Sequence, residues 1–92
     1  MAANNDDIVK RARADLAKRL GVSETEISQE SVEDASFPDT ALGASTKGEM
    51  SGQMITSGVR IRLQAGKKGG YEYRASGDQL RLYKFKGSNY RI

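Results

Sequence analysis

Cysteine, histidine and tryptophan are absent from this sequence, and proline occurs once. Without cysteine, neither a disulfide nor a thiolate nucleophile is available. Without histidine, the chain lacks the commonest general base and the commonest transition-metal ligand. These absences argue against zinc, haem and Ser-His-Asp chemistry. We therefore expect no catalytic residue, no metal site and no cofactor, and a protein that is not an enzyme. An enzyme with a lysine, tyrosine or carboxylate base is the last alternative.

Long apolar runs are also absent, because no stretch approaches the ~20 residues that span a membrane. Residues 1–7 have neither the basic nor the apolar region of a signal peptide. We therefore expect a soluble protein without a membrane partner, located in the cytoplasm. A leader that had been trimmed from the chain would leave no trace in this sequence.

The length of 92 residues indicates one small domain, residues 1–92, with a single core. Residues 1–5 have the composition of a disordered end. Residues 38–57 are rich in Gly, Ser, Thr and Ala and are expected to form a long loop.

The net charge of +3 conceals an uneven distribution along the chain. Residues 59–92 contain nine basic and two acidic side chains, whereas residues 31–58 contain one basic and four acidic side chains. The basic excess therefore lies in the half of the chain that has the strongest strand pattern, and this is the clearest hint of function in the composition.

Residues 57–85 are predicted to form two or three antiparallel strands. Apolar and polar side chains alternate through residues 59–65, as a half-buried strand requires. Glycine-containing reversals are expected at 67–70 and 77–78, and a turn at 86–89. For the last three residues the sequence allows two alternatives, a loose end or a short terminal strand.

The first half of the chain predicts one helix and one strand. A helix over residues 7–20 has apolar side chains at three-to-four spacing and a stop at Gly21. Residues 23–26 have the pattern of a capping box, which opens a short helical turn. Residues 28–36 form a polar, edge-like strand that ends at Pro38.

The fold class is therefore α+β, with one N-terminal helix packed on a three- to four-stranded antiparallel sheet. The long loop precedes the central hairpin, and its second half is expected to return to the core. The predicted core consists of Val9, Ala12, Leu16, Leu20, Ile27, Val32, Phe37, Ile55, Val59, Ile61, Leu63, Tyr71, Tyr73 and Leu82.

Residues 15–28 also resemble the first helix and turn of a helix-turn-helix unit, in which Thr25, Ser28 and Gln29 would face bases. Two observations oppose this alternative. Residues 29–34 are acidic where a recognition helix approaches phosphates, and the chain has no room for a third supporting helix. An ordinary helix end followed by a capped turn explains the pattern better.

The basic strand face is the second candidate surface. Arg60, Arg62 and Arg74 alternate with core residues and should share the outer face of the sheet, where Arg81 joins them only if its strand points the same way. With Tyr83, Phe85 and Tyr90 nearby, this face could form a weak single-stranded nucleic-acid platform. The alternative is a solvated polar face, which antiparallel sheets commonly have.

The long loop is the third candidate, as a binding loop that presents its backbone to another protein. A flexible connection is the plainer alternative. We expect a non-catalytic binding module with a protein partner, and a monomer or a weak homodimer formed through the exposed edge strand. The residues predicted to contact a partner on these two surfaces are Arg60, Arg62, Arg74, Asp39 and Gln53.

The order of these motifs resembles a small bacterial α+β domain family with no established activity. The resemblance spans about residues 16–75. Phe37, Thr40 and Ala44 depart from it, because tryptophan, glycine and cysteine are common at those positions. It implies a strand after the turn at residues 20–23, and it implies no mechanism. The residues that carry it are Leu20-Gly21-Val22-Ser23, Ser31-Val32-Glu33, Phe37-Pro38-Asp39, Leu42-Gly43, Gln53, Ile55, Gly58, Arg60-Ile61, Leu63 and Tyr71-Glu72-Tyr73.

Overall fold

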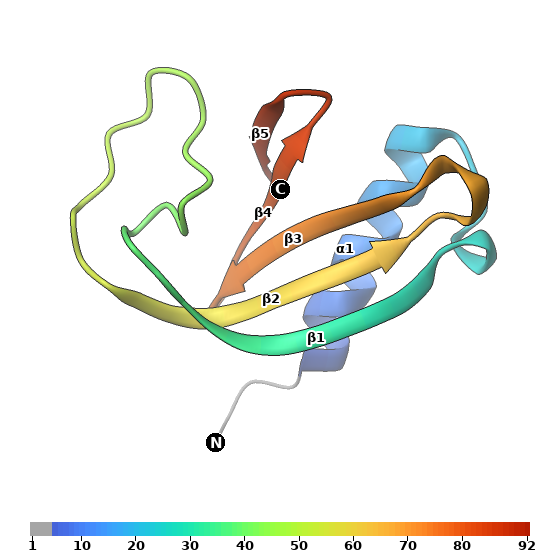
Figure 1. The fold of residues 1–92 in the computed structure, drawn as a ribbon, viewed down its shortest axis with the longest axis horizontal. Helices are drawn as coiled ribbons and strands as arrows, with labels where there is room; N and C mark the ends of the chain where they lie inside the picture. Colours follow the sequence, from blue (N-terminus) through green and yellow to red (C-terminus); the bar gives the residue numbers. More distant parts are fainter. Residues whose placement is uncertain (1–4) are drawn as a thin grey trace.

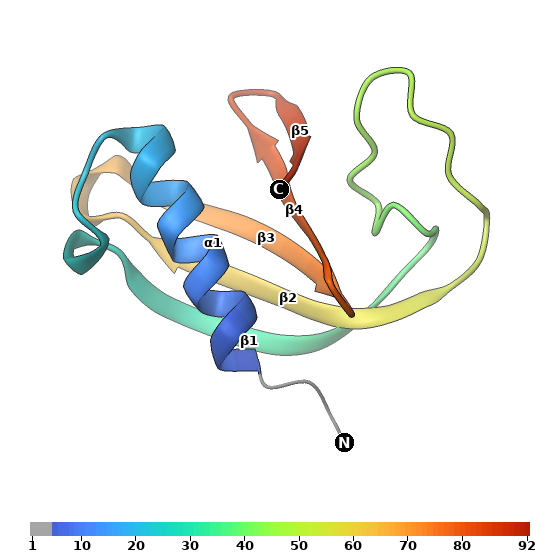
Figure 2. The same cartoon turned by 180° about the vertical axis from the view of Figure 1, so that it is seen from behind.

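A computed structural model describes residues 5–92 as one helix on one face of a five-stranded sheet (Figures 1 and 2). The elements are α1 (Asn5–Leu20), the 3-10 turn η1 (Glu24–Glu26), β1 (Ser28–Phe37), β2 (Thr56–Gln64), the 3-10 turn η2 (Gly66–Lys68), β3 (Gly70–Ser76), β4 (Gln79–Phe85) and β5 (Ser88–Arg91). The strands pair antiparallel in the order β1-β2-β3-β4-β5. The α+β class is confirmed.

The sheet has five strands, so the prediction of three to four was wrong. The extra strand is β5, which is four residues long and therefore too short to show a clear alternation. The turn before it is shorter than predicted: Lys86 and Gly87 both have positive φ values, as in a two-residue type I′ hairpin turn. Residues 88 and 89, which were assigned to the turn, lie in β5.

Helix α1 begins at Asn5, two residues before the predicted start, and ends at Leu20 as predicted. Asp6 and Asp7 lie in its first turn and Lys18 and Arg19 in its last, which complements the helix dipole. Gly21 has a φ of 68°, and the Val22 N–H donates to the Ala17 carbonyl at 3.0 Å, which closes the helix. Apart from Asn5, the residues predicted to be a disordered end lie outside those described.

The turn after the helix corrects the helix-turn-helix interpretation. The Ser23 hydroxyl accepts a hydrogen bond from the Thr25 N–H, and the Glu26 carboxylate accepts one from the Ser23 N–H, as the capping box predicts. The turn is only three residues long, and β1 begins at Ser28, where a recognition helix would have to continue. That DNA-binding alternative is therefore wrong.

The main core lies between α1 and the helix-facing side of the sheet. Its centre is the row Ile61, Tyr73 and Leu82, which pair across β2, β3 and β4. Most of the predicted core is buried there. Leu20, Val32, Val59 and Tyr71 are only partly buried. The core also contains five residues that were not predicted to be part of it: Ala17, Ala65, Ala75, Leu80 and Phe85.

Two predicted core positions lie elsewhere. Phe37 is buried, but outside the main core cluster, close to Arg74. Ile55 is 77 % exposed, so its assignment to the core was wrong. The second half of the long loop does not return to the core, because Met50 and Met54 are also exposed, and β2 begins only at Thr56.

The loop therefore covers residues 38–55, since residues 56 and 57 of the predicted loop belong to β2. Its first half packs on the sheet and buries Ala41, Leu42 and Ala44, none of which was predicted. In Figure 1 the loop leaves the end of β1, extends to the side of the sheet on which β5 lies, and returns to the start of β2. Across the described residues, no helix is long and apolar enough to span a bilayer.

Candidate partner-binding surface

The outer face of the sheet, opposite α1, carries the predicted arginines. Arg60 pairs across the sheet with Arg74, and Arg74 with Arg81, while Arg62 pairs with Glu72. This register confirms that Arg60, Arg62 and Arg74 share a face, and it adds Arg81 to them. The four side chains do not form an open basic platform, because each has a different environment.

Glu72 lies in the middle of this face and neutralises part of its charge. Its carboxylate lies 2.8 Å from Arg74 Nε, 3.3 Å from Arg60 Nε and 3.8 Å from Arg62 Nε. Arg60 Nε is buried and makes no hydrogen bond with a described residue despite this ion pair. Arg62 is the most open of the three, with 49 % of its side chain exposed.

Arg74 holds the long loop rather than facing solvent. Its guanidinium carbon lies 3.7 Å from the centre of the Tyr83 ring and 5.4 Å from that of Phe37, within cation–π range. Its Nη1 donates to the Leu42 carbonyl at 2.9 Å. Gly43 lets the loop approach this closely, because a Cβ there would stand 2.7 Å from Arg74 Nη1.

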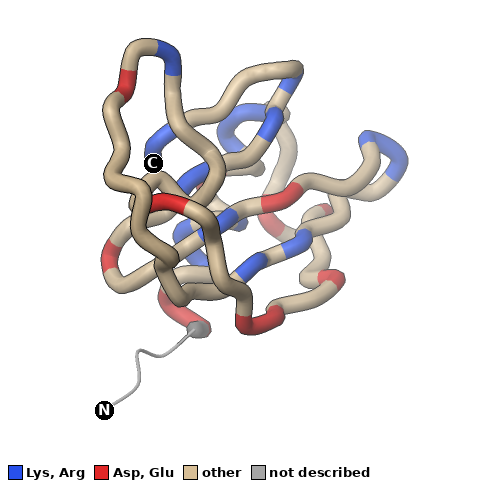
Figure 3. Tube along the Cα trace, turned by 60° about the vertical axis from the view of Figure 1, so that its left-hand side comes forward, with Lys and Arg blue, Asp and Glu red and all other residues tan. Residues whose placement is uncertain are grey.

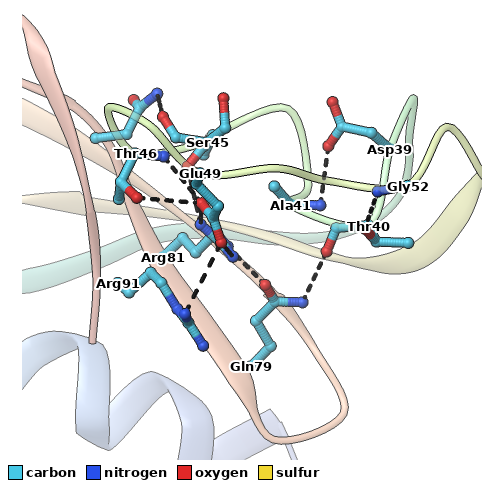
Figure 4. A network of polar contacts seen from close by, with 12 residues as sticks. Asp39, Thr40, Ala41, Ser45, Thr46, Glu49, Gly52, Gln79, Arg81 and Arg91 are labelled. Atoms are coloured by element: carbon cyan, nitrogen blue, oxygen red, sulfur yellow. Dashed lines mark hydrogen bonds and ion pairs between the residues drawn. The ribbon is translucent and has the colours of Figure 1, made fainter.

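Arg81 forms the second and deeper anchor of the loop (Figure 4). Its side chain is 3 % exposed, and its two terminal nitrogens each donate to one oxygen of Glu49 at 2.6 Å. Arg81 also donates to the Ala44 carbonyl at 3.3 Å and to Gln79 Oε1 at 2.6 Å. The hydrogen bonds from Arg81, assisted by the Thr46 N–H, lower the pKa of Glu49 to about 2.

The first half of the loop is further fixed by hydrogen bonds to its backbone. Asp39 Oδ1 accepts from the N–H groups of Ala41 and Gly43 at 2.9 and 3.0 Å, which makes Asp39 a structural residue of the turn. Gln79 donates to the Thr40 carbonyl and Asn89 to the Ser45 carbonyl. Strands β4 and β5 therefore bind the loop at several separate points.

The second half of the loop presents an exposed segment, which we define as residues 50–55. Met50, Met54 and Ile55 are 96 %, 66 % and 77 % exposed. Gly52 ties the segment to Thr40, because its N–H donates to Thr40 Oγ1 at 2.8 Å and its carbonyl accepts from the Thr40 N–H at 3.0 Å. Large apolar side chains are thus exposed before and after Gly52, whose backbone Thr40 holds in place.

The five residues predicted to contact a partner therefore have different environments. Gln53 lies in the exposed segment and Arg62 is open on the sheet. Asp39 and Arg74 are used within the loop and its anchor, and Arg60 is partly covered beside Glu72. Figure 3 shows basic and acidic segments interleaved on this side of the molecule rather than one continuous basic area.

The aromatic residues near the basic strands are engaged within the fold. Tyr71, Phe85 and Tyr90 form one cluster with ring centres 5.7 and 6.1 Å apart, and Arg19 lies 4.5 Å over the Tyr90 ring. Tyr73 donates to Asp15 at 2.7 Å; burial, and then this hydrogen bond, raise the pKa of its phenol above the usual range. Residues 5–92 contain no group of three or more acidic side chains that could hold a metal ion.

Sequence reasoning missed the Glu49–Arg81 pair, which organises the whole loop. One signal could have pointed to it. Arg81 lies between Leu80 and Leu82 in the third predicted strand, and Glu49 is one of only two carboxylates in the loop. An arginine on a covered face needs a carboxylate partner, but the sequence does not show that the loop covers this face.

Comparison with known proteins relates most of the chain to a protein family. The model of a family described as "Domain of unknown function (DUF8738)" matches residues 9–83. No curated protein and no solved structure matches the chain. The matched region runs from α1 to β4 and includes the loop and both of its arginine anchors.

Proposed function

Because the chain belongs to this family, DUF8738, whose description assigns no activity, we propose a function from the geometry: a non-catalytic module that binds a partner protein through the exposed segment. The single observation behind the proposal is the exposure of Met50, Met54 and Ile55 within six residues of chain. Such a group of exposed apolar side chains typically marks an interaction site.

The way the loop is held supports the proposal. Glu49, next to Met50, is fixed by the buried Arg81, and Gly52 is fixed by Thr40. A segment that is already ordered loses less conformational entropy when it binds, so its contacts contribute more to affinity. Methionine adds adaptability, because its flexible thioether side chain fits irregular apolar surfaces.

The non-catalytic part of the proposal has a separate support. Within residues 5–92, Glu49 and Tyr73 are the two groups with strongly displaced pKa values, and displaced pKa values often mark catalytic residues. Here both groups are structural, because Glu49 holds the loop and Tyr73 joins β3 to α1 through Asp15. Their displaced pKa values therefore need no catalytic explanation.

Site-specific photo-crosslinking tests the proposal. A photoreactive residue at position 54 should produce a discrete adduct with one partner protein in cells of the source organism, whereas the same residue at position 67, an exposed lysine on the far hairpin, should not. The purified partner should bind Met50→Ser/Met54→Ser/Ile55→Ser at least tenfold more weakly than wild type. Equal binding by this variant, or equal adducts at positions 54 and 67, would refute the proposal.

Single-stranded nucleic acid is the second candidate, and the exposed Arg62 beside Arg60 favours it. Against it, Glu72 lies among the arginines, and Arg74 and Arg81 are occupied by the loop. Titration of a labelled single-stranded oligonucleotide at low and high salt decides between the candidates. Binding that weakens with salt and is lost in Arg62→Ser would support nucleic acid, and no binding at low salt would end this candidate.

A further inference from the structure

We propose that the free edge of β1 binds an extended, basic segment of another protein, which adds to the sheet as a further strand. This surface is separate from the exposed segment and does not depend on the function proposed above. The argument begins with hydrogen bonding: β1 pairs with β2 over nearly its whole length, and no described strand pairs with its other side (Figure 1). An edge strand directs unpaired N–H and C=O groups outward, and these bind extended peptides.

Strand β1 has a long edge, and its only charged side chains are the acidic Glu30, Glu33 and Asp34. Natural edge strands are usually short or carry lysine, proline or bulges that hinder pairing. Strand β1 is ten residues long and contains neither lysine nor arginine, and its proline comes only after its last residue. The single irregularity in its register lies between Gln29 and Ser31, so residues 31–37 form a regular edge.

The charge of β1 selects the partner. Glu30, Glu33 and Asp34 are exposed, and none forms an ion pair with another described residue. Glu33 and Asp34 are successive strand residues and therefore project from opposite faces of the sheet. Two adjacent basic residues in an added strand would also project from opposite faces, and each would meet one carboxylate. Two copies of β1 would instead oppose like charges, which disfavours a second copy as the occupant.

Hollows along β1 offer space for the side chains of an added strand. One of about 450 Å³ lies between Gln29 and the first half of α1, where Val9 and Arg13 line it. Another, of about 420 Å³, lies beside Asp34, Ser36 and Gly58. Asp6, Asp7 and Lys10 line the first hollow as well, so charged side chains of both signs border it.

The test uses a synthetic ten-residue peptide with blocked ends, alternating Thr and Val, and a central Lys-Arg pair. Amide shifts in NMR spectra of the labelled protein should concentrate in residues 31–37, and binding should weaken as salt rises. The same peptide with a central Glu-Glu pair should bind at least tenfold more weakly. Methylation of alternate peptide nitrogens should abolish binding in one of the two possible phases, because only one set of N–H groups faces β1.

Matched charge reversals supply the control. Glu33→Lys/Asp34→Lys should lose the basic peptide and bind the acidic one, whereas Glu24→Lys/Asp78→Lys makes the same change of net charge away from β1 and should bind as wild type. Circular dichroism checks that both variants fold. Equal binding of both peptides, tolerance of methylation in both phases, or formation of β1-mediated dimers by the protein alone would overturn the proposal. Met50→Ser/Met54→Ser/Ile55→Ser should still bind the basic peptide, which keeps this test independent of the exposed segment.

Discussion

Glu49 is the residue whose ionisation contributes most clearly to folding. Its pKa of about 2 lies below the usual 4.5, so the folded state favours the carboxylate. The stabilisation is therefore complete above pH 4.5 and is lost as pH falls from 4.5 through 2. One pKa unit corresponds to about 1.4 kcal/mol, and after a discount for partial solvent access we expect about 2 kcal/mol.

Glu49→Gln tests this contribution. The variant should be less stable than wild type by about 2 kcal/mol at pH 7, and the difference should shrink toward pH 2. Urea unfolding followed by circular dichroism across this pH range measures it. Glu24→Gln, the same change on an exposed turn, is the control. The difference between its free energy of unfolding and that of wild type should be the same at every pH. A constant difference between Glu49→Gln and wild type at every pH would contradict the assignment.

Two isoleucines differ in burial, and their alanine variants should therefore differ in stability. Ile61 is fully buried at the centre of the core, and its replacement by alanine should cost about 2–5 kcal/mol. Ile55 is exposed, so Ile55→Ala should change the free energy of unfolding by less than about 0.5 kcal/mol. The sequence could not distinguish them, because both are isoleucines near the start of a strand pattern. Chemical denaturation measures the free energy of unfolding of both variants. Equal losses of stability would contradict the different burial of the two side chains.

The loop is the element in which the sequence was least informative. Composition predicts a loop over residues 38–57, and the structure has it over residues 38–55, with the same beginning and an end two residues earlier. Its contacts could not be predicted, because Leu42 and Ala44 have no periodic neighbours that would reveal their burial. Strands β2 and β3 were predictable for the opposite reason, since their alternation fixes which side chains face α1.

The buried ion pair of the loop should show strong coupling between its partners. Glu49→Met alone leaves the Arg81 guanidinium buried without its carboxylate and should cost about 3 kcal/mol. Glu49→Met/Arg81→Met removes both charges and should recover much of that loss. A double-mutant cycle by urea denaturation measures the coupling, with Arg81→Met as its fourth corner. Additive losses would mean that the pair does not act as a unit.

Gly58 allows β2 and β3 to approach closely, because it has no Cβ. A Cβ at this position would stand 2.1 Å from the Ala75 carbonyl oxygen, so Gly58→Ala must displace backbone. We expect a loss of about 3 kcal/mol, at the upper end of the range for overpacked sites. Gly52→Ala is the control, because a Cβ there would lie at an ordinary 3.5 Å from Thr40. A Gly58→Ala protein as stable as Gly52→Ala in thermal melts would contradict this geometry.

At the scale of the whole molecule, charge separates the two edges of the sheet. Strand β1 carries three acidic side chains, whereas β5, at the opposite edge, ends with the exposed Arg91. The segmental charges in the sequence predicted a basic half, and that prediction holds along the chain. The open basic face that this half was expected to form is absent, because Glu72 pairs with three of its arginines and Glu49 pairs with two others once the chain folds.

Removal of the acidic charges from β1 should change the solution behaviour of the protein. Glu30→Ser/Glu33→Ser/Asp34→Ser removes the repulsion between two copies of β1 and leaves the hydrogen-bonding edge in place. The variant should self-associate at concentrations at which wild type shows less association. Sedimentation equilibrium of both proteins over the same concentration range measures the effect. Stronger association by wild type would show that these carboxylates do not prevent pairing.

The way in which the loop is anchored also makes the fold a practical scaffold. Residues 50, 51, 53 and 54 lie outside the core, and the ties at Glu49 and Gly52 do not depend on their side chains. New sequences grafted there would be displayed by a frame that needs no disulfide to hold its shape. Randomised libraries at these four positions would therefore remain usable under reducing conditions, in which disulfides do not persist.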